Sequence, residues 1–563
     1  MRTYTVADYI ADYLKAIGVE RIYGIIGTSV LDFVDALFDR RDSIRYVSTR
    51  HEQVAVAMAD AEYRVSGRMA AALVHAGPGF LNSLISLGVA YKDHVPLLLV
   101  SGGVKRRLYG TDAWLEVDQQ SIARSLTKAS ARINDSSSLR GTLDALVRKA
   151  LTPPKGPVLL EVPEDLWTKP APQSPLPSGL GELEPEPTLP SRDEVVAVLD
   201  EISRASRPLV YVCGEAVGPG IEQVVGELSE RLGAYVVTSG NARGACSEAH
   251  PRCLGRVGFG GGTLPADKAF ETADYILVLG DELDDIATYS YTMYPEGDIT
   301  IVSENPIVEK RPIYYNRLVR ASPYHYARLL LEEARKKGVA RENPEWDREI
   351  AGYKATWNTV LEEAVTRKYE GFANPSLFFK KLAERIGEDT IITAGQGTHI
   401  VYTYDYIRVT KPGRFLAATN LGAMGYAFPA ALGAKLARPE SDVIAVVGDG
   451  EFMMTVQDLE TAVRERIPVK VVVVNDNSYR VLLLRQRLQK GGRIYGTLHS
   501  NPSFEALARV FGAEGVTVSG DDDIDEALKA MLDSDKPFVV DLQISPEDLP
   551  PLNLEGSLRM SGG

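Results

Sequence analysis

Two carboxylates in the last third of the chain each follow a run of apolar residues. Asp449 lies in a Gly-Asp-Gly turn after residues 443–447, and Asp476 lies in an Asn-Asp-Asn sequence after residues 469–474. Residues 455–467 between them carry apolar side chains at helical spacing. A right-handed crossover therefore places both strand ends at one edge of a parallel sheet, where ligands bind. The two carboxylates can face one hard cation such as Mg²⁺, and the flanking glycines let the backbone approach a phosphate closely.

Short apolar strands alternate with helical segments along the chain, a pattern that predicts an α/β fold with parallel sheets. The expected strands are 22–26, 44–47, 70–74, 97–100 and one within 156–165, then 209–213, 235–238, 275–279 and 299–302, and finally 443–447, 469–475, 538–544 and one that starts at Ile391. The expected connections are a Pro-, Gly- and Glu-rich linker at 169–192, a polar linker at 338–371, and a tail at 546–563 that we expect to be a mobile lid or disordered.

The composition excludes several classes of protein. The 563 residues include 62 Lys and Arg against 76 Asp and Glu, and the net charge of −14 argues against a nucleic-acid partner. No apolar run reaches the length needed to span a membrane, and the first residues lack the apolar core of a signal peptide. Three cysteines without zinc spacing fit a reducing compartment, so we expect a cytoplasmic protein.

Several motifs, in order along the chain, carry a family resemblance. They are Tyr-Gly-Ile-Ile-Gly at 23–27, His51-Glu52, Gly-Ala-Met-Gly at 422–425 and the two carboxylate segments. Together they resemble the thiamine diphosphate (ThDP) enzymes of the pyruvate decarboxylase and acetolactate synthase superfamily, over essentially the whole chain. The resemblance implies ThDP and Mg²⁺ as cofactors. It also implies a homodimer or homotetramer in which Glu52 of one subunit and the Asp449 domain of another share a cofactor.

The same resemblance implies three doubly wound parallel-sheet domains. They are a pyrimidine-binding domain at 1–168, a central domain at 193–337 and a diphosphate- and Mg²⁺-binding domain at 372–545. Central domains of this family often hold FAD or an ADP moiety such as that of CoA, and many hold nothing. The family's acid pattern at a strand end is altered here to Val-Ser-Glu-Asn at 302–305, so we favour a purely structural central domain.

The resemblance also implies the metal ligands and the cofactor-binding residues. Mg²⁺ would be bound by Asp449, Asp476 and the backbone carbonyl of Ser478. The family usually has Asn in place of Asp476, so the second ligand is either Asp476 or Asn477; a further carboxylate suits Mg²⁺, which prefers oxygen. The residues implied to bind the cofactor are Gly397, Thr398, His399, Gly422, Met424, Gly448, Asp449, Gly450 and Glu451.

Two residues have catalytic roles by this resemblance. Taken alone, Glu52 is an acid in the first turn of a helix, where it complements the dipole by less than about 1 kcal/mol. The matching Glu of the family hydrogen-bonds the aminopyrimidine ring and favours the imino form that acts as general base on the thiazolium carbon. Met424 matches the bulky apolar residue beneath the bent cofactor, a position that suits a flexible thioether.

Residues 110–119 give the most information on substrate. They resemble a segment of acetolactate synthases, with Trp114 and Leu115 in place of Phe and Gln, and the His-His pair of pyruvate decarboxylases is absent. Residues 78–82 and Asp118-Gln119 instead resemble oxalyl-CoA decarboxylase and 2-hydroxyacyl-CoA lyase. The candidates for the substrate pocket are Ile26, Gly27, His75, Trp114 and Leu115, of which His75 is either a proton carrier or an ordinary loop histidine.

These observations predict a ThDP- and Mg²⁺-dependent enzyme that breaks or forms the carbon–carbon bond beside a 2-oxo group. An acetolactate synthase-like carboligase, which decarboxylates pyruvate and transfers the acetaldehyde unit, is the leading hypothesis. A 2-hydroxyacyl-CoA lyase or oxalyl-CoA decarboxylase is the second, so the substrate is a small 2-oxo acid or an acyl-CoA. A cofactor-binding paralogue with a structural or regulatory role and little turnover is the alternative from another class.

Overall fold

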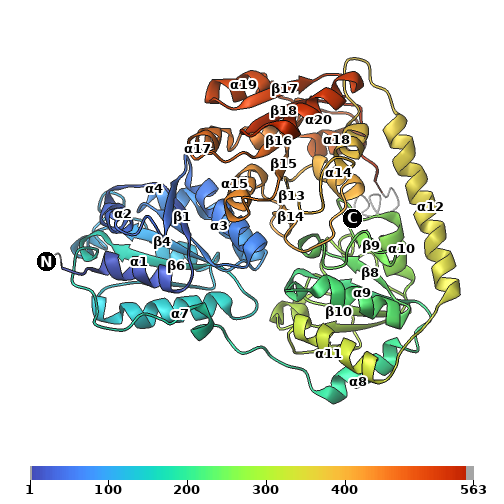
Figure 1. The fold of residues 1–563 in the computed structure, drawn as a ribbon, viewed down its shortest axis with the longest axis horizontal. Coiled ribbons are helices and arrows are strands. Elements are labelled where there is room, and N and C mark those ends of the chain that lie inside the picture. The colour runs from blue at the N-terminus through green and yellow to red at the C-terminus, as the bar shows by residue number, and fades with distance from the viewer. Residues whose placement is uncertain (1–2, 553–563) are drawn as a thin grey trace.

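Three parallel sheets of six strands each form the structure, a computed structural model that describes residues 3–552. Figure 1 shows the first domain in blue, the central domain in green to yellow and the last domain in orange to red. The predicted α/β fold with three parallel-sheet domains is confirmed. Within residues 3–552, no helix is both long and apolar enough to cross a bilayer.

The first sheet is built from strands that are buried on both faces, as the run Ala-Ala-Ala-Leu-Val at 70–74 illustrates. In spatial order its strands are β2 (Arg45–Ser48), β1 (Arg21–Gly24), β3 (Ala70–Val74), β4 (Leu97–Gly103), β6 (Val158–Pro163) and β5 (Ala129–Arg132). Its helices are α1 (Val6–Ala16), α2 (Leu31–Phe38), α3 (Glu52–Ser66), α4 (Pro78–Asn82), α5 (Leu84–Lys92), α6 (Gln119–Ala123) and α7 (Leu139–Leu151).

The third sheet repeats the strand order of the first. In spatial order it consists of β14 (Phe415–Ala417), β13 (Ile391–Ala394), β15 (Val443–Gly448), β16 (Lys470–Asn475), β18 (Phe538–Gln543) and β17 (Glu514–Val518). Its helices are α13 (Pro375–Ala383), α14 (His399–Tyr406), α15 (Ala427–Ala437), α16 (Asp449–Phe452), α17 (Leu459–Arg464), α18 (Arg480–Gln489), α19 (Phe504–Phe511) and α20 (Ile524–Asp533). In both sheets the strand order reverses beside the first strand, which creates a crevice at the carboxyl ends.

The central sheet has the order of a dinucleotide-binding fold, with its crevice between β7 and β10. Its strands are β12 (Arg317–Val319), β11 (Asp298–Val302), β10 (Tyr275–Leu279), β7 (Pro208–Val212), β8 (Tyr235–Thr238) and β9 (Cys253–Arg256), and its helices are α8 (Arg192–Ile202), α9 (Ile221–Leu232), α10 (Leu264–Thr272) and α11 (Pro323–Lys336). The following connection contains α12 (Pro344–Thr366), which runs along one side of the molecule in Figure 1.

Helices α3 and α15 join the first and third domains through one hydrophobic core. They cross so closely that a Cβ on Gly433 would lie 2.7 Å from the Cα of Met58. Residues 54–59 of α3 are completely buried against this contact. The carboxyl edges of the first and third sheets are therefore held in a fixed relation within one chain.

Several elements differ from the sequence expectations. The expected helix 455–467 is divided into a 3₁₀ turn at Val456–Asp458 and α17, and β1 ends at Gly24 instead of residue 26. Strand β4 continues to Gly103, and five further strands (β5, β9, β12, β14 and β17) were not predicted. Of the tail expected to be a lid or disordered, residues 553–563 lie outside the described part, while residues 545–549 pack on the third domain.

Candidate active site

A cavity of about 100 Å³ lies at the carboxyl edge of the third sheet, where β13, β15 and β16 end. It collects most of the cofactor and metal residues expected from the sequence, namely Gly397, Thr398, His399, Met424, Gly448, Asp449, Gly450, Glu451, Asp476 and Ser478. Gly422 does not line it but precedes Met424 in the same turn, with a φ of +69° that favours glycine. All residues that line the cavity belong to the third domain.

Asp449 is the first residue of α16 and is buried. One carboxylate oxygen accepts the Gly450 N–H at 2.7 Å, and the other accepts Asn501 Nδ2 at 2.8 Å and lies 3.3 Å from His499 Nε2. A Cβ on Gly450 would lie 2.6 Å from the Tyr479 ring, so this turn admits only glycine. The sequence analysis missed His499 and Asn501, because they lie in an irregular segment with no motif spacing.

Asp476 lines the cavity, and Asn477 does not. The backbone of Asn477 has a φ of +57°, and its side-chain oxygen accepts the Asn501 N–H at 3.1 Å. Burial raises the pKa of the Asp476 carboxyl, the Arg480 guanidinium 3.1 Å away opposes that rise, and Asp449 adds to it. Of the two alternatives for the second metal ligand, the geometry favours Asp476.

Glu451 connects three loops around the cavity. Its carboxylate accepts the backbone N–H of Gln396 and of Gly425, both at 3.0 Å. It also occupies the space that a Cβ on Gly395 would need. Its hydrogen-bonding capacity is thus directed to the backbone of the loops at 395–399 and 422–425, which suits a positioning residue better than a direct cofactor ligand.

Three buried polar atoms of residues that line the cavity lack a hydrogen-bond partner among the described residues, namely His399 Nε2, Ser478 Oγ and Arg480 Nε. His399 Nε2 lies 3.4 Å from the Glu451 carboxylate, which is an ion-pair distance without hydrogen-bond geometry. Buried orphan polar atoms of this kind call for a ligand. No cluster of three or more His, Cys, Asp or Glu suited to a metal occurs within residues 3–552. A site with two carboxylates and a carbonyl fits Mg²⁺, which keeps waters and phosphate oxygens as its other ligands.

Glu52 lies at the corresponding carboxyl edge of the first sheet, where it begins α3. It is buried, with 7% of its surface exposed. Asn82 Nδ2, which the sequence analysis did not select, donates to one carboxylate oxygen at 3.0 Å. The other oxygen would lie 3.1 Å from a Cβ on Gly79. The carboxylate is therefore fixed on one side, and within residues 3–552 its other oxygen accepts no hydrogen bond.

His75 follows β3 and lies beside Gly27, whose missing Cβ leaves room for the imidazole ring. Its Nδ1 lies 2.7 Å from Ser29 Oγ and accepts the Ser29 N–H at 3.4 Å. Ser29 is itself held by two hydrogen bonds. Its hydroxyl accepts the Ala76 N–H, and its carbonyl accepts Trp167 Nε1. Because a backbone N–H can only donate, Nδ1 is the acceptor and the neutral ring carries its proton on Nε2. Burial lowers the pKa of His75 and favours this neutral form.

The other substrate-pocket candidates lie on exposed loops. Trp114 is 80% exposed and Ile26 is 45% exposed. Leu115 is half-buried, with a φ of +71°, and its carbonyl lies 2.6 Å from the position of a Cβ on Gly77. These residues border the first domain's crevice and do not line the cavity of the third domain.

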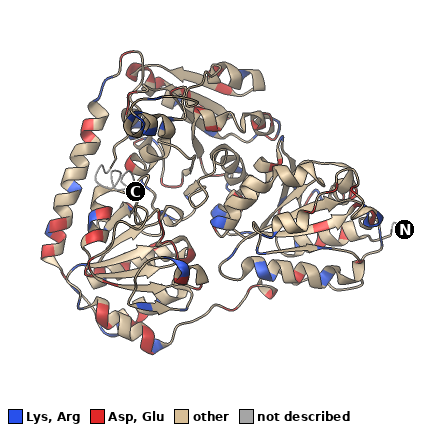
Figure 2. Cartoon of the chain, turned by 180° about the vertical axis from the view of Figure 1, so that it is seen from behind, with Lys and Arg blue, Asp and Glu red and all other residues tan. Residues whose placement is uncertain are grey.

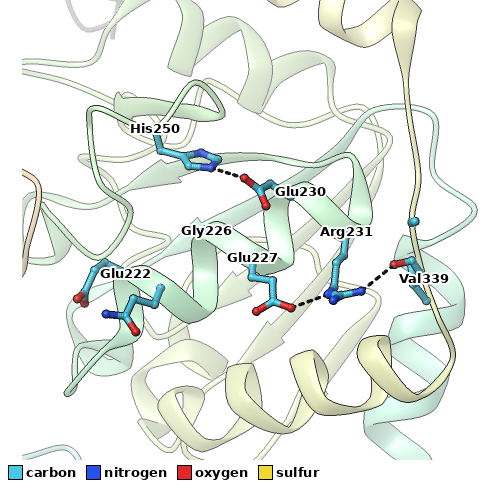
Figure 3. A pocket seen from close by; sticks show the side chains of 9 residues that line it. Glu222, Gly226, Glu227, Glu230, Arg231, His250 and Val339 are labelled. Carbon is cyan, nitrogen blue, oxygen red and sulfur yellow. Dashed lines mark hydrogen bonds and ion pairs between the residues drawn. The ribbon is translucent and has the colours of Figure 1, made fainter.

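A larger hollow of about 660 Å³ lies on the surface of α9 (Figure 3). It is open, and its polar side chains pair with one another: His250 with Glu230 at 3.1 Å and Arg231 with Glu227 at 2.7 Å. It contains none of the predicted site residues. We therefore locate the functional site in the smaller cavity at the strand ends, where the orphan polar atoms and glycine turns are.

The crevice of the central sheet is filled by the chain itself. The Glu282 carboxylate, just after β10, accepts the Gly214 N–H at 2.8 Å and the Ser239 hydroxyl. Its other oxygen accepts Asn241 Nδ2 at 2.8 Å and Asn420 Nδ2 at 3.1 Å. The neighbouring cavity measures about 10 Å³, which is space for a single water.

Comparison with known proteins gives matches along the whole chain. Residues 4–122, 195–310 and 395–542 match, in this order, the N-terminal TPP-binding, central and C-terminal TPP-binding domains of thiamine pyrophosphate enzymes. The acetolactate synthase large subunit of Mycobacterium tuberculosis is 30% identical, over 96% of this chain and 88% of its own length. The isozyme 3 large subunit of Escherichia coli is 30% identical over 92% and 90% of the two chains. A putative thiamine pyrophosphate-containing protein of Bacillus subtilis is 28% identical over 97% and 92%.

Proposed function

The chain belongs to the thiamine pyrophosphate enzyme family, and on that premise we propose an acetolactate synthase-like carboligase. Such an enzyme removes CO₂ from a 2-oxo acid and transfers the remaining acyl unit to a second carbonyl. The observation that carries the proposal is the cavity that unites Asp449, Asp476 and Ser478 with the glycine turns of β13 and β15. It has the donor set for Mg²⁺ and the exposed backbone N–H groups for a diphosphate.

Within this cavity, Asp449, Asp476 and the carbonyl of Ser478 would hold Mg²⁺, and the loop at 397–399 would hold the diphosphate. When bound, ThDP supplies the electron sink that makes cleavage of the bond next to the carbonyl possible. Met424 would supply an apolar surface beside the cofactor. Glu451 holds the loops at 395–399 and 422–425 in fixed positions relative to each other. The protein contributes position and exclusion of water.

Two residues of the first domain would handle protons and substrate oxygens. Glu52 is fixed by Asn82 through one oxygen, which leaves the other for a proton shared with the aminopyrimidine ring. His75 presents Nε2–H as a hydrogen-bond donor, because Ser29 occupies Nδ1. A donor in this position suits a carbonyl or carboxylate oxygen of a 2-oxo acid.

In the assembly that we propose, a second copy of the chain brings its first-domain residues to the cavity. The cavity receives no lining residue from the first domain. Large apolar side chains are exposed next to site residues on several loops, namely Ile26, Leu81, Leu421, Met453 and Met454. We therefore propose a homodimer or homotetramer in which these surfaces are covered. In the view of Figure 2, acidic and basic residues are interspersed over the domains, which argues against a nucleic-acid partner.

Two finer proposals concern the central domain and the location. We propose that the central domain holds no FAD or ADP moiety, because Glu282 already takes the backbone N–H and hydroxyl that a phosphate would use. The three cysteines are buried and free, which fits a reducing compartment, and we propose the cytoplasm.

The second candidate is acyl-CoA chemistry. It is favoured by residues 78–82, which resemble the acyl-CoA enzymes and which the fold packs directly against Glu52 through Asn82 and Gly79. A lyase or decarboxylase of this class would use the same Glu52 and the same metal site. The two candidates differ in substrate only.

The test is to load the purified protein with ThDP and Mg²⁺ and to supply three substrates separately. The proposal predicts acetolactate from pyruvate, and neither formyl-CoA from a 2-hydroxyacyl-CoA nor formyl-CoA from oxalyl-CoA. Formyl-CoA without acetolactate would replace the proposal by the second candidate. Cofactor binding without turnover of any of the three would indicate the structural or regulatory paralogue.

A further inference from the structure

Asp476 brings a second negative charge to a site that must also accept a diphosphate. Its side chain is 4% exposed, and it lines the same cavity as Asp449. Two buried carboxylates place two negative charges beside the phosphate oxygens, and a positive charge in addition to that of the metal lowers the repulsion. The chain supplies such a charge from α18.

Arg480 is the first residue of α18 and pairs with Asp476 at 3.1 Å, with only 5% of its side chain exposed. A cation at the amino end of a helix opposes the helix dipole, so the position is unfavourable for the helix itself. Burial of a guanidinium is also costly unless it is paired. The place of Arg480 is therefore explained by its partners and not by the helix.

Those partners extend to the segment that follows β18. Arg480 Nη2 donates to the Asp548 carbonyl and to the Ser545 carbonyl at 3.4 Å, and it lies 3.6 Å from the Asp548 carboxylate. Tyr369 donates to that carboxylate at 2.7 Å, and Tyr402 donates to it as well. Arg480 thus joins the loop that carries Asp476 to a rigid, hydrogen-bonded segment.

We infer that Arg480 is a positioning residue of the metal site, which neutralises Asp476 and holds it so that this carboxylate can serve where the family usually has Asn. The inference rests on the Mg²⁺–diphosphate site proposed above. It makes Asp476 and Arg480 one unit: without Arg480 the buried Asp476 carboxylate loses its cationic partner, whereas Arg480 without Asp476 still has the Asp548 carboxylate at 3.6 Å. In the double variant with Asp476→Asn and Arg480→Gln, a neutral amide replaces the carboxylate and the cation is also absent.

A competing explanation is that Arg480 merely anchors the segment at 545–549. Arg487 provides a matched control, because it lies on the same helix and contacts the same segment. Its Nη1 donates to the Pro546 carbonyl at 3.1 Å, and it pairs with Glu547 at 3.1 Å. Within residues 3–552, Asp476 pairs with Arg480 and not with Arg487.

The experiment measures ThDP affinity at saturating Mg²⁺ by calorimetry, so that it needs no turnover. The proteins are the wild type, Arg480→Gln, Asp476→Asn, the double variant and Arg487→Gln. We expect Arg480→Gln to weaken ThDP binding by about tenfold or more, the range seen when a residue that orients a metal ligand is lost. In the Asp476→Asn background the same change should cost less than about threefold, and Arg487→Gln should bind like the wild type.

Equal losses from Arg480→Gln in both backgrounds, or wild-type affinity of Arg480→Gln, would overturn the inference. An Arg487→Gln loss as large as that of Arg480→Gln would assign the effect to anchoring instead. If Arg480→Gln does not fold, folding and binding of the double variant support the inference, and its failure to fold contradicts it. Absence of ThDP binding in the wild type would instead refute the proposed function.

Discussion

At the scale of single residues, the chemistry of the site depends on which side-chain atoms already form hydrogen bonds within the protein. Glu451 lines the cavity, yet two backbone N–H groups take up its carboxylate. Ser29 likewise occupies Nδ1 of His75 and leaves Nε2 as the donor. Residue type and spacing predicted that these positions belong to the site, but the direction of each polar atom is set by tertiary contacts that no motif encodes.

The tautomer of His75 gives the first prediction. In His75→Gln the side-chain amide reaches the place of Nε2 and can still donate, whereas in His75→Asn the shorter amide reaches only the place of Nδ1. We expect kcat within about tenfold of the wild type for Gln and a loss of about 100-fold for Asn, the cost of one lost donor. Steady-state kinetics with pyruvate check this. If both variants lose activity equally, His75 acts as a base and not as a donor.

A second prediction concerns Asp458, which links the first and third domains by accepting the Arg50 N–H at 2.8 Å. Burial raises its pKa from 3.8 to about 6, and its Oδ2 has no partner in the described residues. The folded state therefore binds more protons than the unfolded state between these values, and stability falls as the pH rises through this window.

Asp458→Asn keeps an acceptor for the Arg50 N–H and removes the charge. We expect the variant to be more stable than the wild type at pH 8 by about 2 kcal/mol, and the difference to shrink towards pH 4, where the wild-type carboxyl is protonated. Thermal or urea unfolding at both pH values measures it. A difference that does not depend on pH would contradict the assignment.

At the scale of elements, the strands that the sequence pattern missed share one property. All five (β5, β9, β12, β14 and β17) lie at an edge of their sheet. Strands buried on both faces read as continuous apolar runs, such as Val471–Val474. An edge strand has one neighbour only, and its sequence can be as polar as Ala-Ser-Ala-Arg in β5. Local pattern therefore predicts the interior strands of each sheet and, among the edge strands, only β2.

The predicted polar linker at 338–371 illustrates a related effect. It contains the 23-residue helix α12, in which Trp346 and Trp357 are buried. Few residues of α12 are buried, because its first half packs on the central domain and its second half on the third domain. The apolar positions are therefore too sparse for the sequence pattern to indicate a helix. The expected helix at 455–467, in contrast, breaks after Asp458, where the chain turns to meet Arg50.

The contact of α3 with α15 gives a third prediction. Ala is normally a better helix residue than Gly, so an exposed helical Gly→Ala change stabilises by about 0.5–1 kcal/mol. At Gly433 the new Cβ would strike the backbone of Met58, and we expect a loss of about 1–3 kcal/mol.

Gly352 on α12 is the control, because it is exposed and nothing lies within 4 Å of its Cβ position. Gly352→Ala should raise the unfolding midpoint while Gly433→Ala lowers it. Equal effects of the two changes would mean that the two helices do not cross as closely as described.

At the scale of the whole molecule, the first and third sheets have the same strand order, and each brings its predicted residues to the crevice beside its first strand. The central sheet has a different order, and its crevice is closed by Glu282, whose carboxylate accepts the Gly214 N–H after β7 and the Ser239 hydroxyl after β8. At the same junction, Asp93 of the first domain accepts Asn241 Nδ2 of the central domain at 3.2 Å and the Asn420 N–H of the third domain at 3.0 Å. The central domain therefore contacts both of the other domains at this junction.

This arrangement predicts that the purified protein carries no flavin. Its absorbance should show no band near that of FAD, and added FAD should leave the unfolding temperature unchanged. The cavity next to the crevice has about 10 Å³ of free space, and the Glu282 carboxylate already accepts the Gly214 N–H in the crevice. A yellow protein, or stabilisation by FAD or ADP, would contradict the role assigned to Glu282.

The central claim is that the carboxyl edge of the third sheet holds Mg²⁺ and the diphosphate of ThDP, with Asp449 as a ligand. Calorimetric titration of ThDP into the wild type and into Asp449→Asn, with and without Mg²⁺, tests it most directly. The account predicts one ThDP per chain, bound only with Mg²⁺, and a loss of more than about 100-fold in the variant, because a direct ligand matters more than the residues that orient it. Binding without Mg²⁺, or equal affinity in wild type and variant, would contradict it.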